Sequence, residues 1–432
     1  MIPIVIADGT AEQQLLSSLR QRSTEVDKKV TESVSQILER VRNEGDAAVR
    51  DYTLKFDGKL PESFEVCRDE INDVLSEADP DFVEALLNAQ ANIVEFHNRQ
   101  KHQSFIDAKP NGVILGQRIR GLHRVGLYVP GGTAAYPSSV LMNAIPAKIA
   151  GVEEIIMVTP PLKNGKANPD ILVAASICGV DRVFLMGGAQ AVAALAYGTE
   201  TVPQVDKIVG PGNIFVATAK KLLYGTVDID MIAGPSEILV LADDSANPKY
   251  VAADLMSQAE HDRLASAILI TTSERLANET ASELKRQMEY LSRKEIIEES
   301  LTNFGGIIIC DNMDTAVRLA NQVAPEHLEV AVDNPFLYLG RLDNAGSVFL
   351  GHYAPEPLGD YYAGPNHVLP TSGTARFFSP LSVDAFVKKS SYIYYTREAL
   401  EEAHEDIILL AKKEGLTAHA NSIEVRFPKS DS

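Results

Sequence analysis

The chain has 432 residues, of which 45% are hydrophobic and 23% are charged, so it can form more than one hydrophobic core and we expect two or more domains. Its formal net charge of −19 repels a phosphate backbone, and no basic cluster with interleaved aromatic residues offsets that charge, which excludes nucleic acid as a partner. No apolar run approaches the roughly 20 residues needed to cross a bilayer, and the first residues lack the basic flank of a secretory signal, so we expect a cytoplasmic protein without a membrane segment.

Residues 1–125 are expected to form a helical region. Apolar residues recur there at helical spacing: Val30, Val34, Ile37, Leu38 and Val41. Further along, Asp79 followed by Pro80 is typical of a helix N-cap and first turn. We expect this region to act as a scaffold that packs on the second of two α/β globules.

After Gly126 the sequence changes to short β-branched runs that alternate with helical stretches. The runs are GLYVP, EIIMVTPP from Glu154, RVFLMG from Arg182 and KIVGPG from Lys207. This alternation predicts a parallel sheet with helices on both faces, in a domain of residues 126–235. The stretches AKIAGVEEIIMV and ASICGVDRVFLM each end a helix at a glycine before a buried strand, which predicts two βα units of one sheet.

A second alternating series predicts another α/β domain over residues 236–380. Its expected strands are SEILVLAD from Ser236, SAILITTS from Ser266, GGIIICDN from Gly305 and HLEVAVD from His327. Beyond Leu381 the sequence becomes polar and helical, with an amphipathic stretch from Glu398, so residues 381–432 are expected to form a small separate helical unit. The predicted fold class is α/β, with two Rossmann-like parallel-sheet globules.

Glycine-rich turns follow three of the expected strands of the first globule. They are VPGGTAAYPSS from Val129, MGGAQAVAAL from Met186 and VGPGNIF from Val209. Glycines let the backbone approach a phosphate closely, and the helix N-terminus that follows favours negative charge. The standard GxGxxG pattern is nevertheless missing, because Phe215 stands where the third glycine is required. The residues alone therefore leave both a dinucleotide site and ordinary tight turns open.

Polar residues with metal-ligating side chains gather in the second half of the chain. They are Gln258, His261, His352, Glu356, Asp360, His367 and His419. Gln258 and His261 stand three apart at the end of an expected helix, which places them on one face. Nitrogen and carboxylate ligands suit Zn²⁺, but ligands this scattered have no local spacing signature, so capping and surface roles stay open.

Glu326 and His327 are adjacent at the start of an expected strand. Neighbours on a strand point to opposite faces, so a shared site requires the pair to lie partly in the preceding turn, where Pro325 favours an irregular backbone. A histidine beside a carboxylate can perform acid and base catalysis near neutral pH. A helix or strand cap beside a surface imidazole is the other interpretation of the pair.

Seven segments together make the chain resemble the histidinol dehydrogenase family over nearly its whole length. They are GLYVPGGTAAYPSSVLMNAIPAKIAGV, GPGNIFVATAKKLLYG, DMIAGPSEILVLAD, SQAEHD, APEHLEV, GDYYAGPNHVLPT and EGLTAHANS. The resemblance implies one Zn²⁺ per subunit, NAD as cofactor, and the reaction of L-histidinol, two NAD and water to give L-histidine and two NADH through an aldehyde.

The same resemblance assigns residues to the site, and none of them is substituted. It implies that the zinc ligands, which also bind substrate, are Gln258, His261, Asp360 and His419. It implies that NAD contacts Tyr128, Gln190 and Asn213, and that the substrate also contacts Ser236, His327 and Glu414. His327 is expected to take the hydroxyl proton, and Glu326 is expected to activate water for the aldehyde.

The resemblance further implies an intertwined homodimer with shared active sites. The C-terminal unit of one subunit would supply Glu414 and His419 to the other, which would explain why the last ligand lies so far along the chain. Two alternatives stay open: a zinc- and NAD-dependent dehydrogenase of the same fold acting on another small alcohol, and a catalytically inactive binding paralogue.

Overall fold

The computed structural model describes residues 2–21, 28–131 and 136–427. Residues 132–135, within the glycine-rich turn that begins at Val129, therefore lie outside the described residues. The chain divides into two compact units, one of Met1–Lys101 with Leu122–Phe386 and one of His102–Gly121 with Val387–Ser432. Among the described residues no helix is both long enough and apolar enough to cross a membrane.

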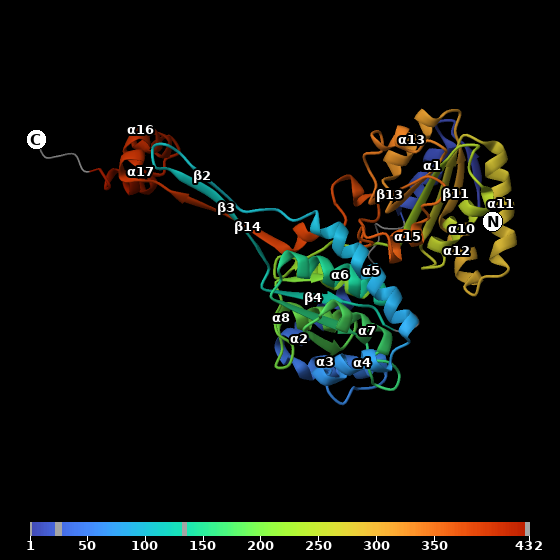
Figure 1. The fold of residues 1–432 in the computed structure, drawn as a ribbon, viewed down its shortest axis with the longest axis horizontal. Coiled ribbons are helices and arrows are strands. Elements are labelled where there is room, and N and C mark those ends of the chain that lie inside the picture. The colour runs from blue at the N-terminus through green and yellow to red at the C-terminus, as the bar shows by residue number, and fades with distance from the viewer. Residues whose placement is uncertain (1, 22–27, 132–135, 428–432) are drawn as a thin grey trace, which may run out of the picture. The chain divides into compact units, whose positions relative to one another are not determined.

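The first unit contains a six-stranded parallel sheet in the order β1-β11-β10-β9-β12-β13 (Figure 1). Its strands are β1 (Ile4–Ile6), β9 (Glu237–Ala242), β10 (Ser266–Thr271), β11 (Gly305–Ile309), β12 (His327–Ala331) and β13 (Ser347–Leu350). Successive side chains of a strand point to opposite faces of the sheet. In β9, Ile238 and Val240 therefore pack towards one helical layer, and Leu239 and Leu241 pack towards the other. Four of these strands lie where the sequence predicted them.

Helices cover both faces of this sheet. One layer is α10 (Pro248–Ala259), α11 (Glu274–Met288) and α12 (Lys294–Phe304), and the other is α1 (Ala11–Gln21) and α13 (Met313–Val323). The helices begin where side chains cap them: Asn247 accepts a hydrogen bond from Lys249 N–H, and Ser273 accepts one from Leu276 N–H. These caps fix where α10 and α11 start.

A five-stranded parallel sheet in the order β6-β5-β4-β7-β8 also lies in the first unit. Its strands are β4 (Arg124–Tyr128), β5 (Glu154–Thr159), β6 (Arg182–Leu185), β7 (Lys207–Val209) and β8 (Asp228–Ile229), and its helices are α6 (Pro137–Ala150), α7 (Pro169–Cys178), α8 (Gly188–Tyr197) and α9 (Ile214–Leu223). The chain builds outward from β4 first through β5 and β6, then through β7 and β8. The strand order therefore reverses between β4 and β7, which is the topological switch point of the sheet.

The two expected βα units are confirmed as neighbours in this sheet. Helices α6 and α7 end at Gly151 and Gly179, which adopt φ values of 81° and 66° in the left-handed region. The strands that follow them, β5 and β6, pair in parallel.

The N-terminal helices pack on the five-stranded sheet and its helices, so the prediction that residues 1–125 pack on the second globule is wrong for most of the region. The helices concerned are α2 (Lys28–Glu44), α3 (Asp46–Asp57), α4 (Arg68–Glu77) and α5 (Pro80–Asn98). The apolar stripe of α2 contacts α8 and α9, and α5 contacts α6 and α7. Only β1 and α1 join the six-stranded sheet, where Ile4 pairs with Ile307.

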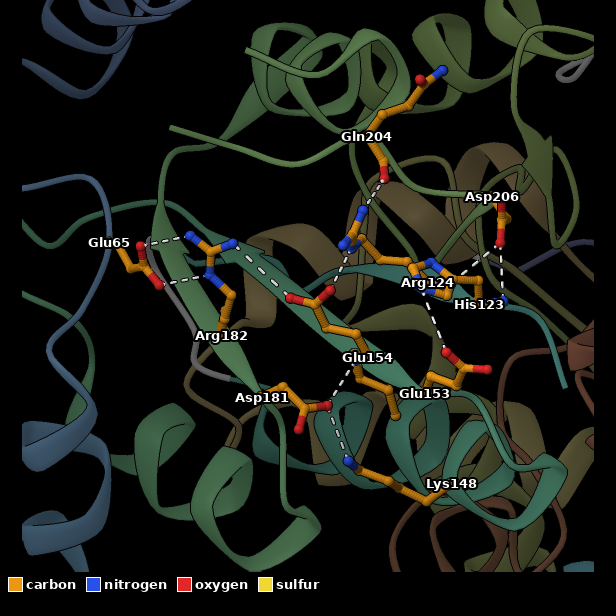
Figure 2. Close-up of polar contacts among 11 residues, drawn as sticks. Glu65, His123, Arg124, Lys148, Glu153, Glu154, Asp181, Arg182, Gln204 and Asp206 are labelled. Carbon is orange, nitrogen blue, oxygen red and sulfur yellow. Dashed lines mark hydrogen bonds and ion pairs between the residues drawn. The ribbon is translucent and has the colours of Figure 1, made fainter. Parts of the chain in front are cut away.

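Ion pairs line the amino-terminal edge of the five-stranded sheet (Figure 2). Arg182, in β6, makes two hydrogen bonds of 2.7 Å to Glu65. Arg124, in β4, contacts Glu154 at 2.5 Å, and the Asp206 carboxylate accepts the Arg124 backbone N–H at 3.2 Å. Because these charges are paired, this edge serves to align the strand starts, and the opposite edge carries the glycine-rich turns.

The second unit is built on an antiparallel three-stranded sheet, so the expectation of a purely helical unit at 381–432 is corrected. The strands are β2 (Phe105–Ala108), β3 (Ile114–Gly121) and β14 (Val387–Tyr394) in the order β14-β3-β2, and the helices are α16 (Arg397–Lys413) and α17 (Thr417–Glu424). These strands have no clear alternating pattern in the sequence, because most β2 and β14 residues are exposed and lack the alternating burial of a packed strand.

Candidate active site

Glu326 and His327 lie together at the amino-terminal edge of the six-stranded sheet. His327 is the first residue of β12, and Glu326 belongs to the turn before it, as Pro325 led us to expect. That turn starts at Ala324, a non-glycine residue with φ 53° and ψ 60°, which redirects the chain at the end of α13. Both side chains are buried, and Glu326 Oε2 lies 3.6 Å from His327 Nδ1. The irregular turn is thus what brings two sequence neighbours into one site.

The two ring nitrogens of His327 have different neighbours. Nδ1 lies 3.1 Å from the Glu237 carbonyl oxygen, which can only accept, so a proton on Nδ1 satisfies this contact. Nε2 then faces two carboxylates, at 3.7 Å from Asp360 Oδ1 and 3.9 Å from Glu356 Oε1. Glu326 is held in place by the Glu237 N–H, which donates to its Oε2 at 2.8 Å. His327 Nε2 therefore points at the carboxylates of Asp360 and Glu356.

Helix α10 brings Gln258 to the same cluster. Gln258 is 1% exposed, and its Nε2 lies 3.2 Å from His327 Nδ1, while its Oε1 is buried without a hydrogen-bond partner among the described residues. The helix ends at Ala259, so His261 lies in the turn beyond it and not on the helix face. The His261 backbone N–H still donates to the Gln258 carbonyl at 3.2 Å. Burial lowers the pKa of His261, and the Asp360 carboxylate opposes this shift. Gln258 therefore reaches the cluster from the end of α10, and His261 lies in the turn that follows the helix.

Glu356 is a member of the cluster to which the sequence analysis gave no role. It stands four residues before Asp360 on the short helix α15 (Glu356–Tyr361), so both carboxylates lie on one helix face. Ligand atoms of His327, Glu356 and Asp360 all lie within 4.8 Å of one another. The four-residue spacing in EPLGD was the signal that would have found it.

Neighbouring polar groups hold these carboxylates. Ser257 O–H donates to Glu356 Oε2 at 3.1 Å, and Glu329 Oε1 accepts the Glu356 backbone N–H at 2.7 Å. The ring of His367 contacts the Asp360 carbonyl through Nδ1 at 2.9 Å. Glu329 was also missed, although it follows His327 by two residues and therefore shares its face of β12.

Burial and charge shift the pKa values of the cluster in opposite directions. Burial raises the pKa of Glu326 to about 7, and burial with the neighbouring Asp360 raises the pKa of Glu356 to about 8. Burial opposes the charged imidazole of His327, but the carboxylates of Glu326 and Asp360 outweigh it and raise its pKa to about 10. For Asp360, burial is outweighed by His327 and His367, so its pKa falls below its usual range. The cluster carries more negative than positive charge, which a cation would balance.

The other residues expected to bind substrate or metal lie in two different parts of the structure. Ser236 immediately precedes β9 and adjoins Glu237, whose N–H binds Glu326, so it lies beside the cluster. Glu414 follows the end of α16, and His419 lies in α17, both in the second unit and both exposed. The structure therefore groups Ser236, Gln258, His261 and Asp360 with the acid and base pair, and places Glu414 and His419 on another folding unit.

Tyr128, Gln190 and Asn213 mark the carboxyl edge of the five-stranded sheet. Tyr128 ends β4, and its hydroxyl oxygen accepts the Gly188 N–H at 3.0 Å. Gln190 lies in the first turn of α8, is 1% exposed, and has no hydrogen-bond partner for either side-chain amide atom among the described residues. Asn213 caps α9, accepting from Phe215 N–H at 3.0 Å. These residues flank the switch point between β4 and β7, where open α/β sheets bind ligands.

A carboxyl group near Tyr128 provides a test of the electrostatics of this edge. Asp57, at the end of α3, has a buried Oδ2 without a hydrogen-bond partner among the described residues. Burial raises the pKa of Tyr128 to about 12, and the charge of Asp57 adds to this effect. Burial raises the pKa of Asp57 from 3.8 to about 6. The folded state therefore binds this proton more tightly than the unfolded state does, and stability is lost as the pH rises from the unfolded value through about 6.

Asp57→Asn is accordingly expected to raise Tm by about 2–4 °C at pH 7.5 and to leave it unchanged at pH 4, in the absence of ligands. The exposed Asp73, for which Asp73→Asn is the matched control, should show no such difference between the two pH values. Thermal unfolding followed by circular dichroism measures both variants. A gain of the same size at pH 4 would contradict the burial explanation.

These features define a class of protein before any comparison is made. Two parallel α/β sheets, a buried imidazole facing carboxylates, and glycine-rich turns at a switch point are consistent with an α/β enzyme that binds a nucleotide cofactor, a class that includes oxidoreductases. A sequence profile described as histidinol dehydrogenase matches residues 20–427. The chain belongs to the histidinol dehydrogenase family.

Relatives and a solved structure agree with that membership. The chain is 58% identical over 424 residues to the histidinol dehydrogenase of Clostridium acetobutylicum, with 98% of each chain covered. It is 55% identical over 423 residues to that of Listeria innocua, covering 98% of this chain and 99% of the relative. The crystal structure of histidinol dehydrogenase from Elizabethkingia anophelis is 38% identical and matches 98% of both chains with a TM-score of 0.92. The expected family and the α/β fold with parallel sheets are confirmed.

Proposed function

We propose that this chain is a zinc-dependent, NAD-linked oxidoreductase that oxidises L-histidinol through histidinaldehyde to L-histidine, in histidine biosynthesis. The observation that carries the proposal is the buried cluster in which His327 Nε2 faces Asp360 and Glu356, while Gln258 Oε1 has no hydrogen-bond partner in the described part of the chain. An imidazole held in position beside the side-chain oxygens of Gln258, Glu356 and Asp360 is suited to a polar substrate that is bound through a cation.

The residues fit a divalent cation. Gln258 Oε1 and Glu356 Oε1 are buried oxygens without hydrogen-bond partners among the described residues, and such atoms are costly unless a ligand satisfies them. We assign Gln258, His261 and Asp360 as zinc ligands, with His419 from a second copy of the chain, and Glu356 as a neighbouring carboxylate. When bound, zinc would orient the substrate through the substrate's nitrogen atoms. It would also supply positive charge that offsets the carboxylates around His327, which lowers the pKa of His327 from about 10 and allows its ring to be neutral.

His327 and Glu326 divide the proton transfers. In the first step the hydroxyl O–H proton goes to His327 Nε2 while the carbinol carbon gives a hydride to NAD, leaving the aldehyde. In the second step, Glu326 takes a proton from water while the water oxygen bonds to the aldehyde carbon. The hydrated aldehyde then gives a hydride to a second NAD. Glu237, which binds both side chains through its backbone, keeps the two bases in fixed positions.

The carboxyl edge of the five-stranded sheet is the proposed NAD site. Tyr128, Gln190 and Asn213 lie beside the switch point, and the Gln190 amide, which makes no hydrogen bond to the residues that the structure describes, is available to a ligand. Residues 126–235 would thus carry the cofactor and residues 236–380 the catalytic and metal residues. Because the turn after Val209 lacks the third glycine, the dinucleotide need not adopt the pose of GxGxxG proteins.

The second unit supports the proposal of a homodimer. Its helices α16 and α17 bury only Ala399, Ala411 and Ala420 among their described residues. Large apolar side chains are exposed on the same unit: Ile106, Ile393, Leu409, Leu410 and Val425. An apolar surface of this kind is typical of a subunit interface. We therefore assign residues 381–432, with Glu414 for substrate and His419 for zinc, to the active site of a second copy.

Neither alternative function is favoured. Relatives of 55–58% identity over nearly the full length are histidinol dehydrogenases, which argues against another small alcohol as substrate. The acid and base residues Glu326 and His327 are both present and buried together, which argues against an inactive binding paralogue.

One assay tests the function directly. Purified protein incubated with L-histidinol and NAD is expected to form two NADH for each L-histidine, to lose activity on chelation, and to recover it with Zn²⁺. Histidinol analogues that lack the imidazole should not be oxidised, because the metal would hold the substrate partly by that ring. One NADH per substrate with free aldehyde as the product, or full activity in metal-free protein, would overturn the proposal.

A further inference from the structure

A buried ion pair near the proposed NAD site has no part in the chemistry described so far. Lys220, in α9, pairs with Asp230, which follows β8, and their side chains are only 3% and 1% exposed. Removing two charges from water is costly, and a buried pair is often no more stabilising than apolar residues of similar size. What the pair holds in place is therefore more informative than its contribution to stability.

The pair binds both backbone polar groups of one residue. Asp230 Oδ2 accepts the Gly210 N–H at 2.8 Å, and Lys220 Nζ donates to the Gly210 carbonyl at 3.0 Å. Asp230 Oδ1 contacts Lys220 and also accepts the Met231 N–H at 2.6 Å. Both side chains are thus committed to the backbone around Gly210, which they clamp from two sides.

Gly210 lies where the chain is most constrained. Its φ is +112°, and a Cβ at this position would stand 2.1 Å from the Tyr128 carbonyl oxygen. The backbone therefore passes directly against the end of β4, at the switch point of the sheet. Two residues further on, a Cβ on Gly212 would stand 2.4 Å from Val216 Cγ1, and then Asn213 caps α9. The clamp thus fixes the turn between β7 and α9, which passes against Tyr128 and ends at Asn213.

We infer that Lys220 and Asp230 are positioning residues that hold the Gly210–Asn213 turn in the shape that receives NAD. The inference rests on the proposed function, because that function assigns Tyr128 and Asn213 to the cofactor. The pair touches backbone and not substrate, so its loss changes how the turn is presented to the dinucleotide and leaves the acid and base cluster intact. Its effect falls on cofactor affinity and not on the hydride transfer itself.

The test replaces the pair with apolar residues of similar size, Lys220→Met with Asp230→Leu. The double variant is expected to keep its Tm within a few degrees, to bind NAD about tenfold or more weakly by calorimetry, and to keep its kcat at saturating NAD and its KM for histidinol. The control is Lys148→Met with Asp181→Leu, an ion pair of 3.0 Å in the same lobe whose Asp181 also accepts a backbone N–H, from Ile155 at 2.8 Å. The control should bind NAD as the original protein does.

Asp230→Asn gives a second measurement that does not depend on the fold tolerating two changes. Asparagine keeps one oxygen for the Gly210 N–H, and it removes the charge together with the second acceptor, which Lys220 and the Met231 N–H use. A weaker NAD affinity at unchanged Tm supports the inference, and a lower Tm with unchanged NAD affinity overturns it, as does a folded double variant with the original affinity. The two proposals are distinguishable, since failure of the unaltered protein to bind NAD or oxidise histidinol would end the proposed function first.

Discussion

Glu326→Gln is expected to slow the oxidation of supplied histidinaldehyde by about 10²- to 10⁴-fold while slowing the oxidation of histidinol to the aldehyde much less. The asymmetry follows from the chemistry, because only the second oxidation needs water to be deprotonated and added to a carbonyl. Glutamine keeps the shape of the side chain and an oxygen for the Glu237 N–H that now donates to Glu326 at 2.8 Å. The variant therefore removes the base without releasing the turn.

The measurement is a pair of single-turnover assays, one started from histidinol and one from histidinaldehyde, each following NADH absorbance. His327→Gln serves as the matched control, since His327 is proposed to take the hydroxyl proton and its loss should slow the first oxidation strongly. Equal losses in both steps for Glu326→Gln would show that Glu326 has no special part in hydration and instead supports His327.

Local signals in the sequence predicted those parts of the fold that depend on neighbouring residues. The start of α5 at Asp79-Pro80 and the glycine ends of α6 and α7 were predicted because a cap requires only residues within one turn. The buried strands of both parallel sheets were predicted because each is a continuous apolar run between turns. Such features do not depend on which distant segment packs on them.

Long-range pairing was not predictable in the same way. The strand Ile4–Ile6 is short, with only one partly buried residue, and its pairing with β11 depends on a segment at the far end of the domain. The apolar stripe of α2 showed that the helix is buried on one side, but apolar contacts are non-directional and the stripe could not identify the sheet it covers. The N-terminal region was therefore assigned to the wrong globule.

The candidate site shows the same difference between features that neighbouring residues predict and features that depend on distant segments. A turn was predicted before His327, because Pro325 restricts the backbone conformation of the residue before it and a shared site for Glu326 and His327 requires an irregular backbone. Glu356 was among the polar residues noted in the sequence but was given no role, since an acidic residue in the first turn of a helix is common. Only the fold brings its Oε1 to 3.9 Å from His327 Nε2. The three-residue spacing of Gln258 and His261 predicted that they share one helix face, but the structure shows that the helix ends between them.

Sharing of the site between two copies of the chain gives the second large expected effect. Asp360→Ala and His419→Ala are each expected to abolish activity in homodimers, since each removes a proposed zinc ligand. In a heterodimer of the two variants, one site would combine the intact Asp360 of one copy with the intact His419 of the other, while the second site would lack both. Heterodimers isolated with two affinity tags should therefore regain about half the activity of the unaltered dimer.

The physical basis is that the two ligands lie on separate folding units. Asp360 lies in the buried cluster of the first unit, whereas His419 is exposed on α17 of the second, whose apolar residues Leu409 and Leu410 are also exposed. The matched control pairs His261→Ala with Asp360→Ala, two ligands of the same unit. No heterodimer of that pair holds an intact site, so it should stay inactive. Recovery in the control, or none in the Asp360 and His419 pair, would contradict a site shared in this way.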